Sequence, residues 1–538
     1  MSDAPLRVLV ADALDAEQLA SLHGRGIEVL DEAGISAEAL RTRLRSVHGL
    51  LVRSRTQVDA DLLSVAPDLR VVGRAGTGVD NIDLEAATRA GVVVMNVPGG
   101  NAVAAAEHTI ALMMSLARQI PVAAASLREG RWDRKRFQGT ELTGKTLGVV
   151  GLGRIGREVA QRAHGLKMRV LAFDPVLTAE VADDMGIGLL PIDELVANVD
   201  FLSVHVPLSD ATRHLVDRAL LAKAKPGLRV LNVARGGIVD EVALLEALES
   251  GSVGGVALDV FEQEPPTDAA LLRHDRVVAT PHLGASTAEA QAGVARAIAD
   301  QVGRFLIDGV MENAVNAAGL DPASRAELAP WLQLARRLGT VAASLVDGGI
   351  RQIDVTLVGE IASGSGDALT TEVLLGLLRP FATDRLNGIN AEWFARERGI
   401  RVSHGSRPSH KSFQSLLRIA VHHGDEATLH LSGTLFGVDN LRIVRAFGFN
   451  IDAIPEGAML FCRNQDRPGI IGHLGTLLAD AGVNIANMSV GRDPNSGEAL
   501  AVLNLDAPPE SEVLAALAAR EEIRWVRYVD AGGSRRDI

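Results

Sequence analysis

Three short segments of the chain place reactive side chains directly after apolar runs that are typical of buried strands. His282 follows "DRVVAT" within "TPHLGAST", Arg235 follows "RVLNVA", and Glu264 ends the segment "ALDVFEQE". A histidine beside a carboxylate can take up a proton near neutral pH, and an arginine can bind a carboxylate through two parallel hydrogen bonds. Together these residue types would suit proton transfer on a small carboxylic acid, although each alone could be an ordinary polar residue that closes a loop.

The surrounding elements decide between these interpretations. From Lys145 onward, six strand-like runs alternate with helical patterns: "TLGVVGLG", "RVLAFD", "VDFLSVHVP", "RVLNVARG", "VGGVALDV" and "DRVVATPH". This alternation predicts an α/β fold, a doubly wound parallel sheet with helices on both faces. Ligands of such sheets bind at the carboxyl ends of the strands, which is where the three segments lie.

A glycine motif opens the same region and predicts a dinucleotide site. In "GLGRIG" a strand is followed by Gly151, Gly153 and Gly156, and a helical pattern begins there. These glycines permit a tight turn, close approach of a pyrophosphate to the backbone, and close packing of the helix on the sheet. Asp174 follows the next strand, where its carboxylate can accept both ribose hydroxyls and would repel a 2′-phosphate. This order of strand, glycine motif, helix, strand and acidic residue predicts NAD as the cofactor. The alternative is a glycine-rich turn with a capping aspartate and no cofactor.

The patterns divide the chain into four parts. Strand-like runs and helical patterns also alternate over the first hundred residues, which predicts a second Rossmann-like domain. A helix around 102–119 carries an alanine and methionine stripe suited to an oligomer interface. An alanine-rich link is expected from 313 to 330. We expect a discontinuous substrate-binding domain of 1–97 plus 284–313, an NAD-binding domain of 98–283, an intervening α+β domain of 314–455 and a ferredoxin-like βαββαβ domain of 456–532.

Composition narrows the possible partners. The 538 residues carry a formal net charge of −13 and only 3% aromatic residues, which argues against a nucleic-acid surface. The single cysteine, Cys462, excludes an intrachain disulfide and a multi-cysteine metal site, and we expect no metal. No signal peptide is evident, and the apolar stretch "AVAAAEHTIALMMSLARQI" is too polar to span a bilayer. We therefore expect a cytoplasmic protein that neither enters a membrane nor binds nucleic acid.

These segments resemble the signatures of the D-isomer-specific 2-hydroxyacid dehydrogenases. The likeness is carried by "GLGRIG", "NVARGGIVDE", "ALDVFEQEP" and "TPHLGAST", while "VRSRT", "GRAGTGVDNIDLEAAT", "NVPGGNAVAAAEH" and "GRWDRKRFQGTEL" resemble the phosphoglycerate dehydrogenase branch. The resemblance implies that Arg235 anchors a carboxylate, that Glu264 orients the histidine, and that His282 is the acid/base. It also implies cofactor contacts at Thr77, Arg154, Ile155, Val206, Ala234, Asp259, Gly284 and Ala285.

The substrate implied by this resemblance has a phosphate as well as a carboxylate. A second basic group is then needed, and Arg53 with Ser54 in "LLVRSRT" can supply a bidentate contact and a neutral hydrogen bond. The resemblance adds Asn101, and Arg134 from a neighbouring subunit of a dimer or tetramer. It implies NAD-dependent oxidation of 3-phosphoglycerate, the first step of L-serine biosynthesis. The alternatives are another small 2-hydroxy acid, such as glycerate or glyoxylate, and an NAD-sensing protein similar to the transcriptional corepressors.

The last segment resembles an ACT domain with an amino-acid site. The glycine-containing loop in "FCRNQDRPGIIGHL" precedes a helix, so its N–H groups would suit the carboxylate of an amino acid. Asp466 could meet the ammonium group, and Asn484 could bridge to the loop of a second subunit. The resemblance implies inhibition by L-serine. Asn464 stands where some family members carry histidine or tyrosine, and a purely structural dimerisation domain is the alternative.

Overall fold

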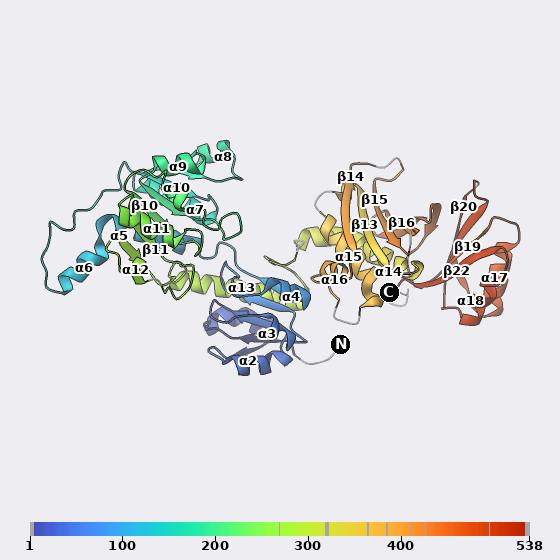
Figure 1. Ribbon diagram of the computed structural model, residues 1–538. Helices are drawn as coiled ribbons and strands as arrows, with labels where there is room; N and C mark the ends of the chain where they lie inside the picture. Colours follow the sequence, from blue (N-terminus) through green and yellow to red (C-terminus); the bar gives the residue numbers. More distant parts are fainter. Residues whose placement is uncertain are drawn as a thin grey trace.

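The computed structural model describes residues 5–267, 269–317, 322–362, 365–382, 386–409, 412–424, 427–493 and 495–532. These residues form four units, each built around one β-sheet (Figure 1). Two of the sheets are entirely parallel, the third is mixed and the fourth is antiparallel. The α/β class and the two Rossmann-like sheets predicted from the sequence are confirmed.

The first sheet is parallel, with the order β2-β1-β3-β4-β5. Its strands are short and apolar: β1 (Arg7–Val10), β2 (Glu28–Asp31), β3 (Gly49–Val52), β4 (Val71–Arg74) and β5 (Val93–Met95). Between them lie η1 (Ala16–Leu19), α1 (Ala20–Gly24), α2 (Ala37–Arg43), η2 (Leu44–Ser46), α3 (Ala60–Ser64) and α4 (Leu84–Arg89). The strand order reverses between β1 and β3, the position where such sheets form a ligand crevice.

The second sheet has seven parallel strands in the order β12-β11-β10-β9-β6-β7-β8. They are β6 (Thr146–Val150), β7 (Arg169–Phe173), β8 (Gly188–Leu189), β9 (Phe201–Val204), β10 (Leu228–Asn232), β11 (Val253–Leu258) and β12 (Val277–Ala279). The prediction of six strands missed β8, because an edge strand of two residues leaves no apolar run in the sequence. The helices are α7 (Arg154–Gly165), α8 (Ala179–Asp184), α9 (Ile192–Asn198), α10 (Arg218–Leu221), α11 (Glu241–Ser250) and α12 (Ala269–Arg273).

Two long helices connect these sheets. Helix α5 (Ala102–Arg118) packs against α7 and β11, and it ends at Gln119, whose φ of 53° turns the chain into α6 (Ile120–Arg128). Helix α13 (Ala288–Asp308) runs from the second sheet to the first (Figure 1). A Cβ on Gly73 would lie 2.7 Å from Val302 and 2.8 Å from Ile298, so α13 rests directly on β4. The chain thus returns to the first sheet after His282.

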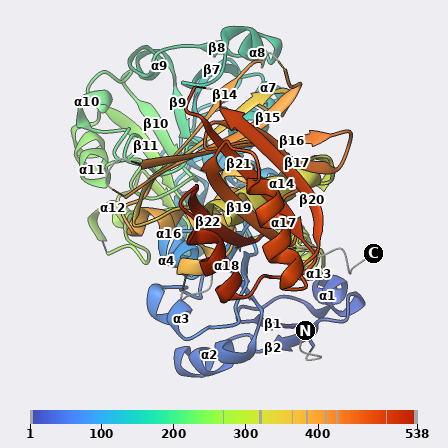
Figure 2. The ribbon, with the colours of Figure 1, turned by 90° about the vertical axis from the view of Figure 1, so that its right-hand side faces the viewer.

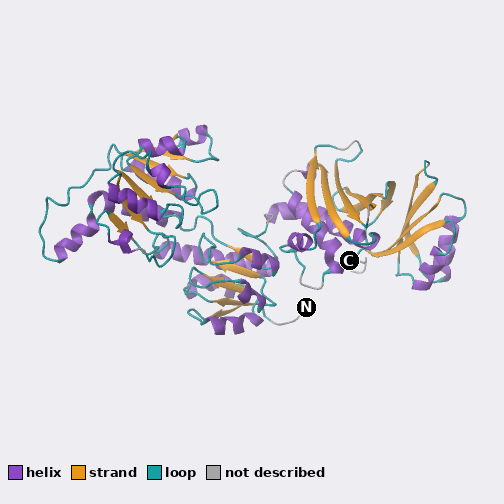
Figure 3. Cartoon of the chain, viewed as in Figure 1, coloured by secondary structure: helices purple, strands orange, loops and turns teal. Residues whose placement is uncertain are grey.

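The third unit is a six-stranded mixed sheet with helices on one face (Figure 3). Its order is β14-β13-β15-β16-β17-β18, from β13 (Ile350–Gly359), β14 (Arg401–Arg407), β15 (Ser415–His423), β16 (Ala427–Phe436), β17 (Asn440–Ala446) and β18 (Phe449–Ala453). The helical elements are α14 (Pro322–Leu345), η3 (Glu360–Ala362), α15 (Gly366–Leu378), η4 (Arg379–Phe381) and α16 (Ala391–Glu397). Helix α14 begins at Pro322, so the expected link to residue 330 was too long. Proline fits a first helical turn, and the alanine-rich residues that follow favour a helix.

The fourth unit has the predicted βαββαβ order and a sheet ordered β20-β21-β19-β22. It comprises β19 (Ala458–Gln465), α17 (Ile470–Asp480), β20 (Ile485–Asp493), β21 (Glu498–Leu505), α18 (Ser511–Ala518) and β22 (Ile523–Asp530). Figure 2 looks onto α17 and α18, which cover one face of this sheet. The other face shares a core with α14 of the third unit, in which Leu500 and Val502 join Leu334 and Leu338.

Candidate active site

The proposed acid/base pair forms at the carboxyl edge of the second sheet. Glu264 follows β11 and His282 follows the neighbouring β12, and His282 Nδ1 lies 2.8 Å from Glu264 Oε2. A carboxylate only accepts hydrogen bonds, so the proton of the neutral imidazole lies on Nδ1 and the lone pair on Nε2. The second carboxylate oxygen of Glu264 accepts the Phe261 N–H at 3.2 Å, which fixes the carboxylate in its own loop. Nε2 is therefore available as a base.

A buried carboxylate holds the loop that carries His282. Asp259 is fully buried, and its side chain accepts hydrogen bonds from the N–H groups of Leu283 and Gly284, both at 2.7 Å. The Thr280 hydroxyl donates to it at 2.6 Å, and His108 Nε2 lies 3.2 Å away. These bonds stabilise a strained backbone, because His282 has a φ of 56° in the left-handed region.

The charge of Asp259 is maintained by the same donors. Burial alone would raise its pKa, but the hydrogen bonds from His108, Thr280, Leu283 and Gly284 outweigh this effect and bring the pKa below the usual value. The cofactor contact predicted at Asp259 remains a prediction, since the carboxylate is already bonded within the protein. The sequence showed Asp259 as a strand-exit residue and the family resemblance added a cofactor contact, but neither revealed its role in holding the loop.

Arg235 follows β10, the next strand of the sheet, and its loop touches the loop of Glu264. A Cβ on Gly236 would overlap the carbonyl oxygen of Phe261, so only glycine permits this contact. The Arg235 guanidinium donates to Asp80 of the first unit at 3.1 Å and to the Ala234 carbonyl at 2.7 Å. Arg235 therefore lies between the two sheets, on the same side as the His282–Glu264 pair.

Arg74 is a basic residue of this site that the sequence analysis missed. It ends β4. Burial lowers the pKa of its guanidinium, and the positive charges of Arg235 and, to a smaller extent, Arg53 lower it further. The negative charges of Asp80 and Asp12 raise this pKa and offset part of the lowering. Its Nε has no hydrogen-bond partner among the described residues. The charges of Arg53 and Arg235 both act on Arg74, so the three guanidinium groups lie close enough to interact electrostatically. The available signal was its position in "VVGRAGTG" at a strand exit, as for Arg53 and Arg235.

Arg53 and Ser54 lie at the exit of β3 beside a hollow of about 400 Å³. Arg53 is half-buried and Ser54 is exposed. The neighbouring Arg55 instead donates to Asp12 at 3.0 Å and to the Ala11 carbonyl at 2.9 Å. Arg134 is exposed on the segment between α6 and β6, and among the described residues it forms no hydrogen bond or ion pair with Arg53 of the same chain. Its predicted role in a neighbouring subunit stays a prediction.

The glycine loop has the shape that a dinucleotide requires. Gly151 has a φ of 92°, and a Cβ there would lie 2.7 Å from Val206 at the exit of β9. A Cβ on Gly156 would overlap the Gly151 carbonyl oxygen, whereas Gly153 faces open space at the start of α7. The open position lies at the helix N-terminus, whose free N–H groups suit a pyrophosphate. These residues fit NAD.

Asp174 is tied to the same loop. Its carboxylate accepts the N–H groups of Leu152 and Val176, each at 2.9 Å, and that of Leu177 at 3.1 Å. Burial opposes its charge, but these hydrogen bonds bring the pKa below the usual value, so the residue carries a negative charge. A 2′-phosphate beside it would be repelled, which agrees with NAD rather than NADP.

The other predicted cofactor and substrate residues lie around this edge and along the connection to α5. Thr77 donates to Asn101 at 2.8 Å, which joins a predicted cofactor contact to a predicted substrate contact. A Cβ on Gly99 would lie 2.6 Å from the Arg154 side chain, so Arg154 packs on the same connection. The remaining positions are Ile155 in α7, the buried Ala234 and Gly284, and the exposed Ala285. No group of three His, Cys, Asp or Glu side chains among the described residues is arranged to hold a metal ion.

The predicted effector residues do not converge within one chain. Asp466 follows β19 and pairs with Arg492 at 2.6 Å, near the buried Asn464. Asn484 precedes β20 and donates to Asp506 at 2.8 Å. The pairing of β19 and β20 with β21 puts Gln465 opposite Glu498 but Ile485 opposite Leu505, so Asp466 and Asn484 lie at opposite ends of the sheet. A site built from both would need two chains.

Three parts of the chain match known family models. Residues 110–284 match the NAD binding domain of the D-isomer specific 2-hydroxyacid dehydrogenases, residues 327–447 match the D-3-phosphoglycerate dehydrogenase intervening domain, and residues 458–522 match the ACT domain. The D-3-phosphoglycerate dehydrogenase of Archaeoglobus fulgidus is 41% identical, over 98% of this chain and 100% of that protein. The chain belongs to the D-3-phosphoglycerate dehydrogenase family.

Solved structures of related dehydrogenases support the same assignment. A glyoxylate reductase from Paecilomyes thermophila is 31% identical with a TM-score of 0.53, and it covers 58% of this chain and 99% of its own. An NAD-dependent formate dehydrogenase from Staphylococcus aureus, in complex with NAD, is 28% identical with a TM-score of 0.52, and it covers 58% of this chain and 100% of its own. The predictions of an NAD-dependent dehydrogenase, of NAD as its cofactor and of an ACT domain are confirmed.

Asp259→Asn is expected to lower the free energy of unfolding at about pH 7 by about 1–3 kcal/mol, because the amide cannot accept all four hydrogen bonds. The pKa of Asp259 is lowered in the folded state, so its contribution is present above the unfolded pKa and disappears as pH falls through the folded pKa. In urea unfolding, the difference from the unmodified protein should therefore shrink below about pH 4. Asp275→Asn, at an exposed aspartate before β12, is the control and should leave stability unchanged. A difference independent of pH would contradict the assigned charge.

Proposed function

We propose that this chain oxidises 3-phosphoglycerate to 3-phosphohydroxypyruvate with NAD, the first step of L-serine biosynthesis. The observation that carries the proposal is the position of the His282–Glu264 pair at the same sheet edge as Arg235, while Arg53 stands at the exit of β3 beside a hollow of about 400 Å³. A base and two separated basic groups are what a phosphorylated 2-hydroxy acid requires. Relatives that align with nearly the whole chain, such as the protein of Archaeoglobus fulgidus, are named D-3-phosphoglycerate dehydrogenase.

In this proposal Arg235 anchors the substrate carboxylate and His282 takes the hydroxyl proton. The lone pair on Nε2 accepts that proton, and the imidazolium that forms is stabilised by the Glu264 carboxylate 2.8 Å from Nδ1. The glycine loop and Asp174 would hold NAD, which would supply the acceptor for the hydride of the carbon that bears this hydroxyl. The Arg235–Asp80 contact at 3.1 Å holds the guanidinium between the two sheets, ready to meet the carboxylate.

The phosphate end would be bound by Arg53 and Ser54. The guanidinium of Arg53 can donate two parallel hydrogen bonds to phosphate oxygens, and the Ser54 hydroxyl can add a third. Asn101, and Arg134 from a second subunit, would complete the substrate contacts. The positive charge of Arg74 behind them would attract a phosphate without needing to touch it.

His282→Ala is expected to lower kcat for NADH formation from 3-phosphoglycerate by about 10²- to 10⁴-fold, because the general base is lost. Glu264→Gln keeps a hydrogen bond to Nδ1 but not the charge, and should lower kcat by about ten- to a hundredfold. His214 and Glu262 form a second histidine–glutamate pair, with Nε2 and Oε1 2.8 Å apart and similar exposure, so His214→Ala is a matched control. A larger loss of kcat in His214→Ala than in His282→Ala would show that His282 and Glu264 are not the acid/base pair.

Arg53→Ala tests the substrate. Losing hydrogen bonds to a charged group should lower kcat/KM for 3-phosphoglycerate by about ten- to a hundredfold. Turnover of D-glycerate, which has no phosphate, should be unchanged. Arg43→Ala removes an arginine of the same domain that is paired with Glu32, and should affect neither substrate. If the chain instead acts on a small 2-hydroxy acid without a phosphate, Arg53→Ala should leave kcat/KM for its best substrate unchanged.

We also propose that the ACT domain binds L-serine and that binding inhibits the enzyme. The loop between β19 and α17 ends at Gly469, whose φ of 94° begins the helix, and Asp466 faces Arg492 beside it. The separation of Asp466 from Asn484 supports a site shared between two chains. The buried amide oxygen of Asn464 has no partner among the described residues, which leaves one acceptor in this loop.

L-Serine at millimolar concentration is expected to slow NADH formation by the unmodified enzyme. Asp466→Ala should weaken this inhibition by about tenfold or more, because a charge-assisted hydrogen bond to the ammonium group is lost. The control is Asp480→Ala at the exposed end of α17, which should leave inhibition unchanged. Enzyme activity that is insensitive to L-serine in all three proteins would favour a purely structural ACT domain.

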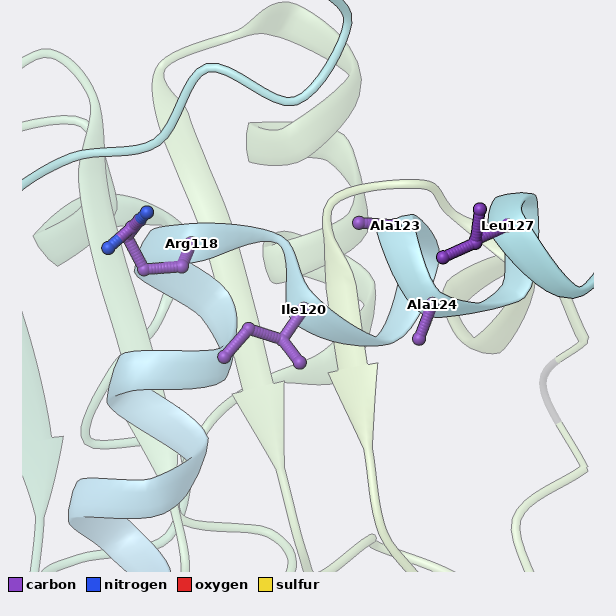
Figure 4. Close-up of a pocket in the computed structure, with 5 residues that line it drawn as sticks. All are labelled: Arg118, Ile120, Ala123, Ala124 and Leu127. Atoms are coloured by element: carbon purple, nitrogen blue, oxygen red, sulfur yellow. The ribbon is translucent and has the colours of Figure 1, made fainter. Parts of the chain in front are cut away.

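The helices α5 and α6 offer a surface for the dimer that the sequence predicts. Ile120 and Leu127 are exposed by 51% and 56%, and with Arg118, Ala123 and Ala124 they line an apolar hollow of about 430 Å³ (Figure 4). Apolar surface of this kind favours burial by a second copy. Among the described residues no single helix is long and apolar enough to span a membrane, and α5 with α6 passes that test only as a pair bent by 62°. A tetramer and a cytoplasmic location remain predictions.

A further inference from the structure

Two buried polar side chains hold the turn of residues 53–56, which carries the proposed phosphate contacts. Asp12 follows β1 and is 3% exposed, and Asn81 lies between β4 and α4 and is 9% exposed. The strands β1 and β3 are neighbours at the point where the order of the first sheet reverses. The turn therefore crosses the position where sheets of this type bind ligands.

Asp12 accepts the hydrogen-bond donors of the turn. Its Oδ2 accepts the N–H of Arg53 at 2.7 Å and that of Thr56 at 3.2 Å. Its Oδ1 accepts the Thr56 hydroxyl at 2.8 Å and the Arg55 Nε–H at 3.0 Å. Burial would raise the pKa of Asp12, but these four hydrogen bonds outweigh it and keep the carboxylate ionised.

Asn81 supplies the opposite polarity from the other side. Its Nδ2 donates to the Arg53 carbonyl at 2.9 Å and to the Thr56 carbonyl at 2.6 Å. The first and last residues of the turn are thus held through both their N–H and their C=O groups. A backbone restrained at both ends in this way has little freedom to change its conformation.

The same contacts decide which side chains remain available. The side chains of Arg55 and Thr56 donate hydrogen bonds to Asp12. The Arg53 guanidinium and the Ser54 hydroxyl form no hydrogen bond or ion pair with the residues that the structure describes. Asp12, Arg53, Ser54 and Arg55 all line the hollow of about 400 Å³ at this edge. The four-residue turn thus presents two free groups to the hollow and uses the other two to fix itself.

We propose that Asp12 and Asn81 are positioning residues that keep Arg53 and Ser54 in the geometry that binds the phosphate of the substrate, an inference that rests on the function proposed above. Neither residue touches the reacting atoms. A turn that is already ordered does not lose conformational freedom when the substrate binds, so the contribution appears in binding. The effect should fall on KM for a phosphorylated substrate and spare kcat.

The test compares KM and kcat for 3-phosphoglycerate, and kcat/KM for D-glycerate, in Asn81→Ala and Thr56→Val. Asn81→Ala should raise KM for 3-phosphoglycerate by about tenfold or more, and the near-isosteric Thr56→Val, which loses one hydrogen bond to Asp12, by about threefold to tenfold. In both variants kcat and the D-glycerate values should stay within about twofold of the unmodified enzyme. If Asn81→Ala does not fold, Thr56→Val alone decides.

Asn316→Ala is the matched control. Asn316 also bridges backbone groups of the first unit, accepting the Val94 N–H and donating to the Val92 carbonyl, each at 2.9 Å, on the side of β5. It should cost stability without raising KM. An equal rise of KM in Asn316→Ala and Asn81→Ala would show general loosening of the domain and would overturn the proposal.

The double variant Arg53→Ala/Asn81→Ala separates this inference from the proposed function. If Asn81 acts through Arg53 and Ser54, the double variant should lose less than the two single effects combined, because only the part that acts through Ser54 remains without Arg53; fully additive effects would overturn the positioning role. An Arg53→Ala variant with unchanged KM for 3-phosphoglycerate would refute the phosphate site itself. A strong effect of Arg53→Ala with none in Asn81→Ala or Thr56→Val would refute only the positioning role.

Discussion

A carboxylate that leaves water must find hydrogen-bond donors inside the protein, and this requirement shapes the loops that carry His282 and Arg53. Asp259 and Asp12 each follow a strand and lie almost fully buried. Asp12 accepts four hydrogen bonds from the turn beside it, and Asp259 accepts three from the loop of His282 and a fourth from His108 of α5. The donors keep both carboxylates charged, and the charge in turn fixes the backbone of the loop. His282 depends on the first of these loops and Arg53 on the second, so two buried negative charges position a base and a cation.

The parallel sheets explain why these loops meet. Arg53, Arg74 and Arg235 each stand at the carboxyl end of a strand, and the two sheets direct these ends toward one another. Three neighbouring guanidinium groups repel one another, and Asp12 and Asp80 offset only part of this repulsion. The positive charge that remains forms a local basic region on a protein whose formal net charge is −13.

Much of this architecture could be predicted from the sequence because strands, helices and glycine turns have local patterns. The alternation of elements, the glycine motif and the strand-exit residues Arg235, Glu264 and His282 required no knowledge of distant contacts. Strand β8 was missed because two residues carry no periodic signal, and the start of α14 was missed because its alanine-rich residues were assigned to a link. Arg74 was missed because its burial and the influence of the Arg53 and Arg235 charges on it depend on the packing of two domains.

Other features depend on more than one chain or on the direction of a side chain. The sequence predicts an effector site in which Asn484 reaches the loop of a second subunit, and Asp466 and Asn484 lie at opposite ends of the sheet of β19 and β20, so only a second copy could bring them together. Arg134, on the segment after α6, is likewise predicted to act on the site of a neighbouring subunit, which a single chain does not test. Asp259 and Asp12 look alike in the sequence, and only their hydrogen bonds show that both face inward to hold a loop.

The shared core between α14 and the ACT sheet has a consequence for how this protein can be divided. Leu334 and Leu338 on α14 are buried partly by Leu500, Val502 and Val529 of the ACT domain, and Arg337 donates to the carbonyls of Pro455 and Gly532. Removing the C-terminal residues would expose this apolar face and leave a guanidinium without acceptors. The ACT domain therefore cannot be removed without changing the rest of the protein: a shortened chain would expose an apolar surface, and its behaviour would reflect aggregation as well as the absence of the domain.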